Sequence, residues 1–309
     1  MKKLDTSKIK TYSLKDRPSK VRMGDFAKPH QPGASFKDFF SSLPNILGAR
    51  HLKDVVAALV QARKDQRPVM LGMGAHSIKV GLNPVIIDLM ERGIITSLSL
   101  NGAGIIHDFE LAFVGQTSED VDKEILSGAF GMAEETGSML NQAIAAASKD
   151  EGIGACVGRM IQAGDFPYKN NSLLAAGHRL GVPVTVHVAI GTDIIHMHPS
   201  FDGQALGAAA QRDFLTFCAL VSELEGGAYI NLGSAVLLPE IFLKAVTLCR
   251  NLGHPLQHFT TVNMDFVQHY RPNTNVVRRP TQGGGRGFAL TGHHEIMLPL
   301  LAAALIEQF

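Results

Sequence analysis

The chain of 309 residues has no tryptophan, only three cysteines and almost no net charge. Its 29 lysines and arginines are balanced by 28 aspartates and glutamates, which excludes both the basic surface of a bulk nucleic-acid binder and a strongly acidic, solvating chain. The cysteines, Cys156, Cys218 and Cys249, are widely spaced and odd in number. This pattern argues against a disulfide framework and predicts a reducing, cytoplasmic setting.

Long hydrophobic runs are also missing. No apolar stretch approaches the roughly 18 residues that a membrane-spanning helix needs, and no apolar segment follows the basic N-terminus as it would in a secretory signal. We therefore expect no membrane partner. The chain does have 45% hydrophobic residues and a mean hydropathy of +0.10, so a chain of this length can bury a large core without a metal or a disulfide.

Residues 1–35 differ in composition from the rest. Eight of the first 25 residues are lysine or arginine, and two prolines and a glycine follow within residues 29–33. We expect a basic N-terminal arm over residues 1–35 and a single domain over residues 36–309. The arm is either a solvated tail or a segment that packs on a neighbouring subunit.

From residue 36 onward, helical and strand patterns alternate. Apolar spacing predicts helices at 50–64, 83–92, 133–149, 170–180, 205–224, 239–251 and 295–308, and strands at 68–71, 94–100, 182–190, 227–232 and 258–263. This alternation predicts an α/β protein with a Rossmann-like, doubly wound, mainly parallel sheet and helices on both faces. Such sheets bind ligands at the carboxyl ends of their strands.

Small or polar turns follow four of these strands. Glycine in such a turn lets backbone N–H groups approach a phosphate, the next helix adds its positive end, and an acid can hold a ribose hydroxyl. One fingerprint glycine is replaced by Ser77, so nucleotide binding and ordinary tight turns both remain open at this point. The turns are Gly72-x-Gly74-Ala75-His76-Ser77, Asn101-Gly102-x-Gly104 with Asp108, Gly191-Thr192-Asp193, and Gly233-Ser234-Ala235.

Histidine is abundant, with 13 residues. His196-x-His198 has a metal-ligand spacing, but no third ligand is defined and we predict no metal site. His76 and His107 follow two different strands, so the sheet can bring them into one cleft. We take His76, His107 and His196 as candidate acid–base residues. The alternative for each is a histidine that caps a turn or lines a polar pocket.

No lysine follows Lys244, whereas arginines surround a glycine-rich stretch at 282–287. A planar guanidinium group can bind a carboxylate or a phosphate through two parallel hydrogen bonds. This pattern predicts substrate contacts from Arg278, Arg279, Gln282 and Arg286, with His198. A flexible surface loop is the competing interpretation.

Taken in order, these turns resemble the deoxyhypusine synthase family of homotetrameric, NAD-dependent transferases. The resemblance covers about residues 65–309. It rests on Gly74-Ala-His-Ser-Ile-Lys-Val-Gly-Leu82, Asn101-Gly-Ala-Gly-Ile-Ile-His-Asp108, Gly191-Thr-Asp193 after Val182-Pro-Val, Leu232-Gly-Ser-Ala-Val-Leu237, and Leu298-Pro-Leu-Leu301 running to Phe309.

The resemblance implies NAD as the cofactor, active sites at subunit interfaces, and an N-terminal segment that covers a neighbour's active-site entrance. The implied cofactor contacts are Gly74, Ala75, His76, Ser77, Asn101, Gly102, Gly104, Asp108, Thr192 and Asp193, with Asn263 and Asp265 on the adenine side.

Two departures from the family bear on the chemistry. The family's imine-forming lysine lies in a Glu-x-x-x-Trp-x-Lys motif, whereas the matching stretch here reads Gln282-Gly-Gly-Gly-Arg286-Gly-Phe288. The family's Lys-His-His is Leu238-Pro239-Glu240 here. No other residue type substitutes for an imine-forming lysine.

We therefore expect NAD-dependent chemistry on a small substrate without a lysine imine, the substrate being anionic if the arginines hold it. One alternative is an aminobutyl transferase of the deoxyhypusine or homospermidine synthase type, acting on spermidine or putrescine, with Lys79 or Lys169 as a substitute nucleophile. The other alternative is a non-catalytic NAD-binding module.

Overall fold

The computed structural model describes residues 3–309, and its contacts divide the chain into two units, one ending at Arg50 and one beginning at His51. In the first unit, residues 3–35 bury no side chain. Ser35 caps α1 by accepting a hydrogen bond from Asp38 N, and the Asp38 carboxylate accepts one from Ser35 N. The elements that begin in this unit are η1 (Leu14–Asp16), η2 (Met23–Asp25), α1 (Phe36–Ser42) and α2 (Leu47–Lys64).

Within the described residues, the second unit contains one six-stranded sheet in which every pairing is parallel. The strand order is β3-β2-β1-β4-β5-β6, the order of dinucleotide-binding sheets. The strands are β1 (Val69–Met73), β2 (Ser97–Asn101), β3 (Val184–His187), β4 (Ala228–Leu232), β5 (Thr260–Asp265) and β6 (Arg286–Thr291).

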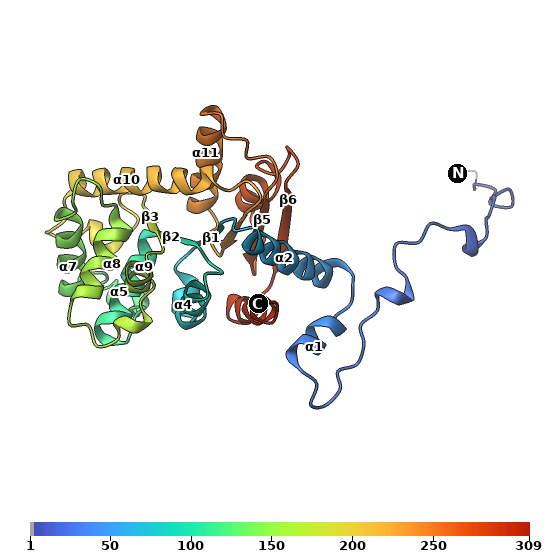
Figure 1. The fold of residues 1–309 in the computed structure, drawn as a ribbon, viewed down its shortest axis with the longest axis horizontal. Coiled ribbons are helices and arrows are strands. Elements are labelled where there is room, and N and C mark those ends of the chain that lie inside the picture. The colour runs from blue at the N-terminus through green and yellow to red at the C-terminus, as the bar shows by residue number, and fades with distance from the viewer. Residues whose placement is uncertain (1–2) are drawn as a thin grey trace. The chain divides into compact units, whose positions relative to one another are not determined.

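Helices cover the sheet on both sides: α10 and α11 lie on one side, and α4 and α13 on the other (Figure 1). The predicted doubly wound α/β fold is therefore confirmed. The helices are α3 (His76–Lys79), α4 (Asn83–Glu91), α5 (Gly102–Val114), α6 (Val121–Glu124), α7 (Glu134–Ala145), α8 (Ile153–Ala163), η3 (Lys169–Asn171), α9 (Leu173–Leu180), η4 (Ile194–His196), α10 (Gly203–Ser222), α11 (Leu237–Asn251), α12 (Tyr270–Pro272), η5 (Asn273–Arg278) and α13 (His294–Ile306).

The central strands are buried along their whole length because both faces carry helices. Aromatic packing fixes the helices of one side to the sheet: the Tyr229 ring of β4 stacks on Phe242 of α11 with 4.0 Å between centroids. Gly72 of β1 leaves room for the tyrosine hydroxyl, since a Cβ atom there would lie 2.3 Å from it. The core therefore requires a glycine in the middle of a buried strand.

Besides several short helical segments, the sequence patterns missed two long helices, α5 and α8, and the strand β6. Each of these three contains at least one glycine, which weakens both helical and strand patterns. In α8 the glycine has a packing reason, because a Cβ atom on Gly154 would lie 2.0 Å from the Val184 carbonyl oxygen of β3. Among residues 3–309, no helix combines the length and the apolar character needed to cross a membrane.

Candidate functional site at the carboxyl ends of the strands

The strand order reverses between β1 and β4, and the turns after these two strands touch. Met73 pairs with Leu232 in the sheet, and Gly74 N donates a hydrogen bond to the Leu232 carbonyl at 3.0 Å. A Cβ atom on Gly74 would lie 2.6 Å from the Gly233 carbonyl oxygen. The close approach therefore requires glycine at residue 74. The crevice at such a reversal is where doubly wound sheets bind dinucleotides.

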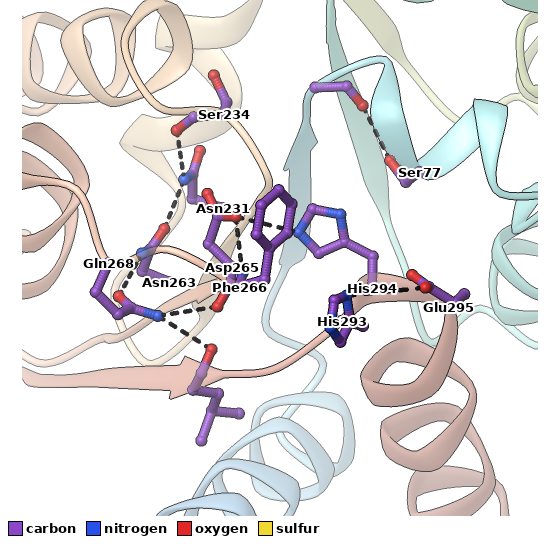
Figure 2. Close-up of polar contacts among 12 residues, drawn as sticks. Ser77, Asn231, Ser234, Asn263, Asp265, Phe266, Gln268, His293, His294 and Glu295 are labelled. Carbon is purple, nitrogen blue, oxygen red and sulfur yellow. Dashed lines mark hydrogen bonds and ion pairs between the residues drawn. The ribbon is translucent and has the colours of Figure 1, made fainter.

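Four rings gather beside this reversal, and we call them the aromatic cluster: His76, Phe266, His293 and His294. They come from α3, from the residue after β5, and from the start of α13. Figure 2 shows Phe266, His293 and His294. The His294 ring centroid lies 5.5 Å from that of His76 and 5.6 Å from that of Phe266. His293 stacks on Phe266 with 5.9 Å between centroids and 14° between planes. Together the rings present a surface suited to a planar ligand.

His294 is the least satisfied polar side chain of the cluster. It is 1% exposed, yet neither ring nitrogen has a hydrogen-bond partner within residues 3–309. Its Nε2 lies 3.6 Å from Asp265 Oδ1, and Gly233 leaves room for the ring, since a Cβ atom there would lie 2.4 Å from Cε1. Buried polar atoms in native proteins normally have partners. A polar ligand group can supply the missing one.

Asp265 remains ionised near neutral pH. Burial alone would raise the pKa of this carboxyl, but the neighbouring His294 and the backbone N–H groups of Phe266 and Val267 outweigh burial and lower the pKa. A fixed negative charge therefore lies beside the aromatic cluster.

An amide chain fixes the ends of β4 and β5. Asn231 Nδ2 donates to the Ser234 carbonyl at 2.9 Å and to Asn263 Oδ1 at 2.7 Å. Asn263 Nδ2 in turn donates to Gln268 Oε1 at 2.7 Å, as Figure 2 shows. Asn263 was predicted to contact the cofactor, but both ends of its amide bind protein. Its observed role is to hold the base of the crevice.

A second region, which we call the α5 cavity, opens on the β2–β3 side of the same edge. Its volume is about 240 Å³. Asp193 lies against the first turn of α5, where a Cβ atom on Gly102 would lie 2.1 Å from its Oδ2. Asn101 caps this helix by accepting a hydrogen bond from Gly104 N at 2.9 Å. The cavity is lined by Lys79, Ala103, Ile106, His107, Glu110, Ser118, Glu119, Val121, Phe130, Thr192, Asp193 and Ile194.

The two titratable groups in the cavity with shifted pKa values are Asp193 and His107. Burial raises the pKa of the Asp193 carboxyl. Burial, with a smaller contribution from the positive charge of Lys79, lowers the pKa of His107 to about 4. His107 is therefore neutral at physiological pH, and its Nδ1 lies 2.6 Å from Thr117 Oγ1. The cavity thus offers an uncharged imidazole beside a carboxyl group.

Three predicted site residues instead hold the scaffold. Asp108 is fully buried and accepts hydrogen bonds from Ser172 Oγ and from the N–H groups of Leu173 and Leu174, so it anchors the N-terminus of α9 and does not face a ribose. His196 Nδ1 accepts from the N–H groups of Gly191 and Asp193. His198 bonds Ser200 Oγ at 2.7 Å and lies 3.4 Å from Glu134.

One predicted substrate contact, Arg286, lies at the amino end of its strand, away from the carboxyl ends where the crevice opens. Arg286 begins β6 and pairs in register with Thr260, the first residue of β5. Its guanidinium lies 3.4 Å from Asp54 and 5.0 Å from the Phe288 ring centroid. Gln282 lies in the loop before β6, and Arg278 and Arg279 end the helix that leads to that loop. The strand β6 was hidden by its glycines, so the prediction could not orient these side chains.

Sequence reasoning left out Phe266 and His294. The pair His293-His294 was visible, but its position at a strand end was not, because β6 was not predicted. Phe266 directly follows β5, whose end was placed at residue 263, two residues early. Among residues 3–309 there is no group of three or more His, Cys, Asp or Glu side chains placed to hold a metal ion.

No model of a known protein family matches the chain, and no curated protein is significantly similar in sequence. Solved structures do share the fold. A putative deoxyhypusine synthase from Entamoeba histolytica is 10% identical with a TM-score of 0.51, and the match covers 91% of this chain and 96% of that one. A conserved putative LOR/SDH protein from Methanococcus maripaludis S2 is 15% identical with a TM-score of 0.51, covering 90% and 71%.

AgrE, solved as a ternary complex with ornithine and NAD+, is 17% identical with a TM-score of 0.52, covering 85% of this chain and 34% of AgrE. ArgZ, an arginine dihydrolase from the ornithine–ammonia cycle in cyanobacteria, gives similar values. The chain thus spans about a third of the length of AgrE and ArgZ. At these identities the likeness concerns the fold, and the predicted resemblance to deoxyhypusine synthase is confirmed at that level: the chain has the fold that these proteins share.

Proposed function

We propose that the chain is an enzyme that binds NAD across the carboxyl edge of its sheet and acts on a small substrate in the α5 cavity. The observation that carries this proposal is the contact between Gly74 and Gly233 at the point where the strand order reverses. The same fold in AgrE, which was solved with NAD+, supports it.

The residues present fit such a cofactor. The turns at Gly74–Ser77 and Gly102–Gly104 would hold its phosphates. Asp193 would accept a hydrogen bond from a ribose hydroxyl. The aromatic cluster would hold the adenine end, where Phe266 offers a stacking face and His294 offers ring nitrogens without partners. A side chain on Gly74 would fill the crevice that these turns form.

The reacting end of the cofactor would lie toward the α5 cavity. NAD supplies hydride acceptance or donation when it is bound. The chain supplies the neutral imidazole of His107, which can accept a proton, and the carboxyl of Asp193. His76, an exposed member of the aromatic cluster, remains a candidate contact.

The charges of the cavity favour an amine or a neutral substrate. Glu110, Glu119 and Asp193 line the cavity with a single cationic side chain, Lys79. Arg286, one of the arginines that suggested an anionic substrate, lies at the opposite end of the sheet. A substrate bearing an amino group is therefore favoured over an anion, and ornithine, which the AgrE complex contains, is a suitable first member of a substrate screen.

Titration of the full chain with NAD by calorimetry tests the cofactor site. We expect saturable binding, weakened in Asp193→Ala by about tenfold or more, the effect of losing a charge-assisted hydrogen bond. Asp165→Ala removes an exposed carboxylate that does not line the cavity and should bind like the wild type. Absence of binding to the wild type would rule the proposal out.

A second function, aminobutyl transfer through a lysine imine, is favoured by one observation: Lys79 lines the cavity that contains Asp193. Lys169, the other candidate, donates to the carbonyls of Gln162 and Gly164 and lies outside it. Borohydride reduction in the presence of NAD and spermidine or putrescine should then modify Lys79, as detected by peptide mass spectrometry. The Lys79→Arg variant should not be modified. An unmodified Lys79 would exclude this covalent form.

We also propose a homotetramer, with the arm of residues 1–35 packed on a neighbouring subunit, and a cytoplasmic location. The arm leaves apolar side chains exposed, among them Leu4 at 90% and Met23 at 83%, and the three cysteines are free and buried. Light scattering of the full chain should give four times the chain mass. A monomer would refute the assembly.

A further inference from the structure

We infer that Thr117 and Glu110 are positioning residues that hold His107 as the Nδ1–H tautomer, so that its Nε2 is the proton acceptor of the α5 cavity. This inference rests on the proposed function, because it assigns the reaction a proton acceptor. The role suits a substrate whose hydroxyl or amino group loses a proton when the adjacent carbon is oxidised.

The tautomer follows from the donors and acceptors of a short hydrogen-bonded chain. The Thr117 hydroxyl donates its only proton to Glu110 Oε2, at 2.5 Å. At 2.6 Å from His107 Nδ1, the same hydroxyl can therefore only accept, so Nδ1 must carry the hydrogen. A neutral imidazole with its hydrogen on Nδ1 has a lone pair on Nε2.

The carboxylate that ends this chain is itself fixed from another helix. Thr136 of α7 donates to Glu110 Oε1 at 3.2 Å, so both carboxylate oxygens accept hydrogen bonds. The chain thus connects α5, the loop after it and α7. A ring whose hydrogen-bond partner is itself fixed in this way loses little further entropy when it reacts, which is what a positioned base requires.

The other ring nitrogen is available to a ligand. Within the described chain, Nε2 of His107 has no hydrogen-bond partner, nor is it among the fully buried polar atoms that lack one. The charged or titratable groups that line the same cavity are Lys79 of α3, Glu110 of α5, Glu119 of the following loop and Asp193 after β3. Burial and Lys79 keep the ring neutral, so Nε2 retains its lone pair at neutral pH.

The proton transfer itself is simple. The bond that breaks is the O–H or N–H bond of the substrate, the proton goes to Nε2, and the electron pair remains on the substrate. The hydride acceptor that completes an oxidation is the nicotinamide cofactor of the proposed function. Glu110 and Thr117 stabilise the resulting imidazolium through Nδ1, without touching the substrate.

Nitrogen-15 NMR of the histidine rings in the full chain tests the inference without any substrate. We expect the His107 resonances, assigned with His107→Gln, to show a protonated Nδ1 and an unprotonated Nε2. Thr117→Val removes the acceptor and should shift the ring toward the Nε2–H tautomer, whereas Thr117→Ser should restore the wild-type pattern. Thr247→Val, on the exposed face of α11 and bonded only to its own helix, is the control.

Each outcome is decisive. An Nε2–H tautomer in the wild type, or an unchanged pattern in Thr117→Val, overturns the inference. Calorimetry with NAD on the same Thr117→Val protein keeps the two proposals separate. We expect its NAD affinity to stay within about twofold of the wild type, because Thr117 is not among the residues proposed to hold the cofactor. Failure of the wild type to bind NAD would refute the proposed function while leaving the tautomer result intact.

Discussion

The aromatic cluster and the α5 cavity lie along the same edge of one sheet, but they satisfy their histidines in opposite ways. His294 is buried with two ring nitrogens that lack hydrogen-bond partners. His107 bonds Thr117, and Thr117 bonds the Glu110 carboxylate, whose two oxygens both accept hydrogen bonds. A buried polar atom without a partner costs free energy, whereas a fully bonded one is fixed in place.

This difference indicates two kinds of site. In the aromatic cluster, a ligand would satisfy atoms that the protein leaves without partners, so ligand binding and stability are linked. In the α5 cavity, the protein has already oriented the reactive group, which is the arrangement that catalysis favours. We therefore interpret the cluster as a recognition region and the cavity as a reaction region.

The largest expected effect is on the turn that lies between the two regions. Gly74→Ala places a Cβ atom 2.6 Å from the backbone oxygen of Gly233, so the turns after β1 and β4 must move apart. We expect NAD binding to become undetectable by calorimetry and the free energy of unfolding to fall by about 1–3 kcal/mol, as for overpacked sites. Gly207→Ala, where a Cβ atom meets nothing within 4 Å, is the control and should bind normally.

A second test concerns the support of the α5 cavity. Burial raises the pKa of Asp108 to about 6, above the 3.8 of an unfolded chain. Between these values the folded protein binds more protons than the unfolded chain, so its stability falls as pH rises from about 4 to 6 and then levels off. The contribution is about 3 kcal/mol. Burial also raises the pKa of Asp213 to about 7, so the fall in stability with rising pH continues to about pH 7.

Urea unfolding at several pH values measures this effect. Asp108→Asn cannot titrate, so its stability should fall less than that of the wild type between pH 4 and 6. It starts lower because an amide cannot accept all four hydrogen bonds that Asp108 receives, from Asn83, Ser172, Leu173 and Leu174. Parallel curves for the two proteins would contradict the assignment of Asp108 as a buried, proton-binding anchor.

A smaller effect distinguishes recognition from stability in the aromatic cluster. His294→Phe keeps a ring in the space that Gly233 leaves, and removes both unpartnered nitrogens together with the 3.6 Å approach of Nε2 to Asp265. Because these two losses offset each other, we expect stability to change by less than about 1 kcal/mol while NAD affinity falls about tenfold. Equal affinity in the variant would show that His294 has no ligand role.

The smallest expected effect is that the His107 ring does not titrate near neutral pH. Because burial lowers the pKa of His107 to about 4, its ring should stay neutral from pH 5 to 8 and gain a proton only below that range. The proton NMR shift of the ring, followed over pH 3–8, measures this directly. A midpoint near the 6.5 of free histidine would remove the basis for a neutral proton acceptor.

The sequence predicted the sheet because buried parallel strands are mainly apolar runs, and Val69–Met73 and Ala228–Leu232 have this pattern. It also located the glycine turns, since their positions follow from the strand ends. It failed for α5 and β6, where glycine has a packing role that the local pattern does not reveal. For example, the first residue of α5 is glycine, Gly102, because the Asp193 carboxyl occupies the space that a side chain would take.

The same reason limits how far site residues can be predicted from the sequence. A polar residue near a strand end can face the ligand or bond the scaffold, and the choice depends on partners that are distant in sequence. Asp108 bonds Ser172, Leu173 and Leu174, which no local pattern connects to it. Arg286 was expected at the site because, without β6, nothing showed at which edge of the sheet it lies.

The order of the strands also has a consequence for how the protein is made. β1 is synthesised before its neighbour β4, because β2 and β3 lie between them in the chain, and the turn that begins α13 emerges later still. Such distant pairings form slowly, and N-terminal parts of a chain leave the ribosome first. The nascent chain therefore exposes the edge of β1 until β4 is available, and the crevice between Gly74 and Gly233 forms only after β4 has been synthesised.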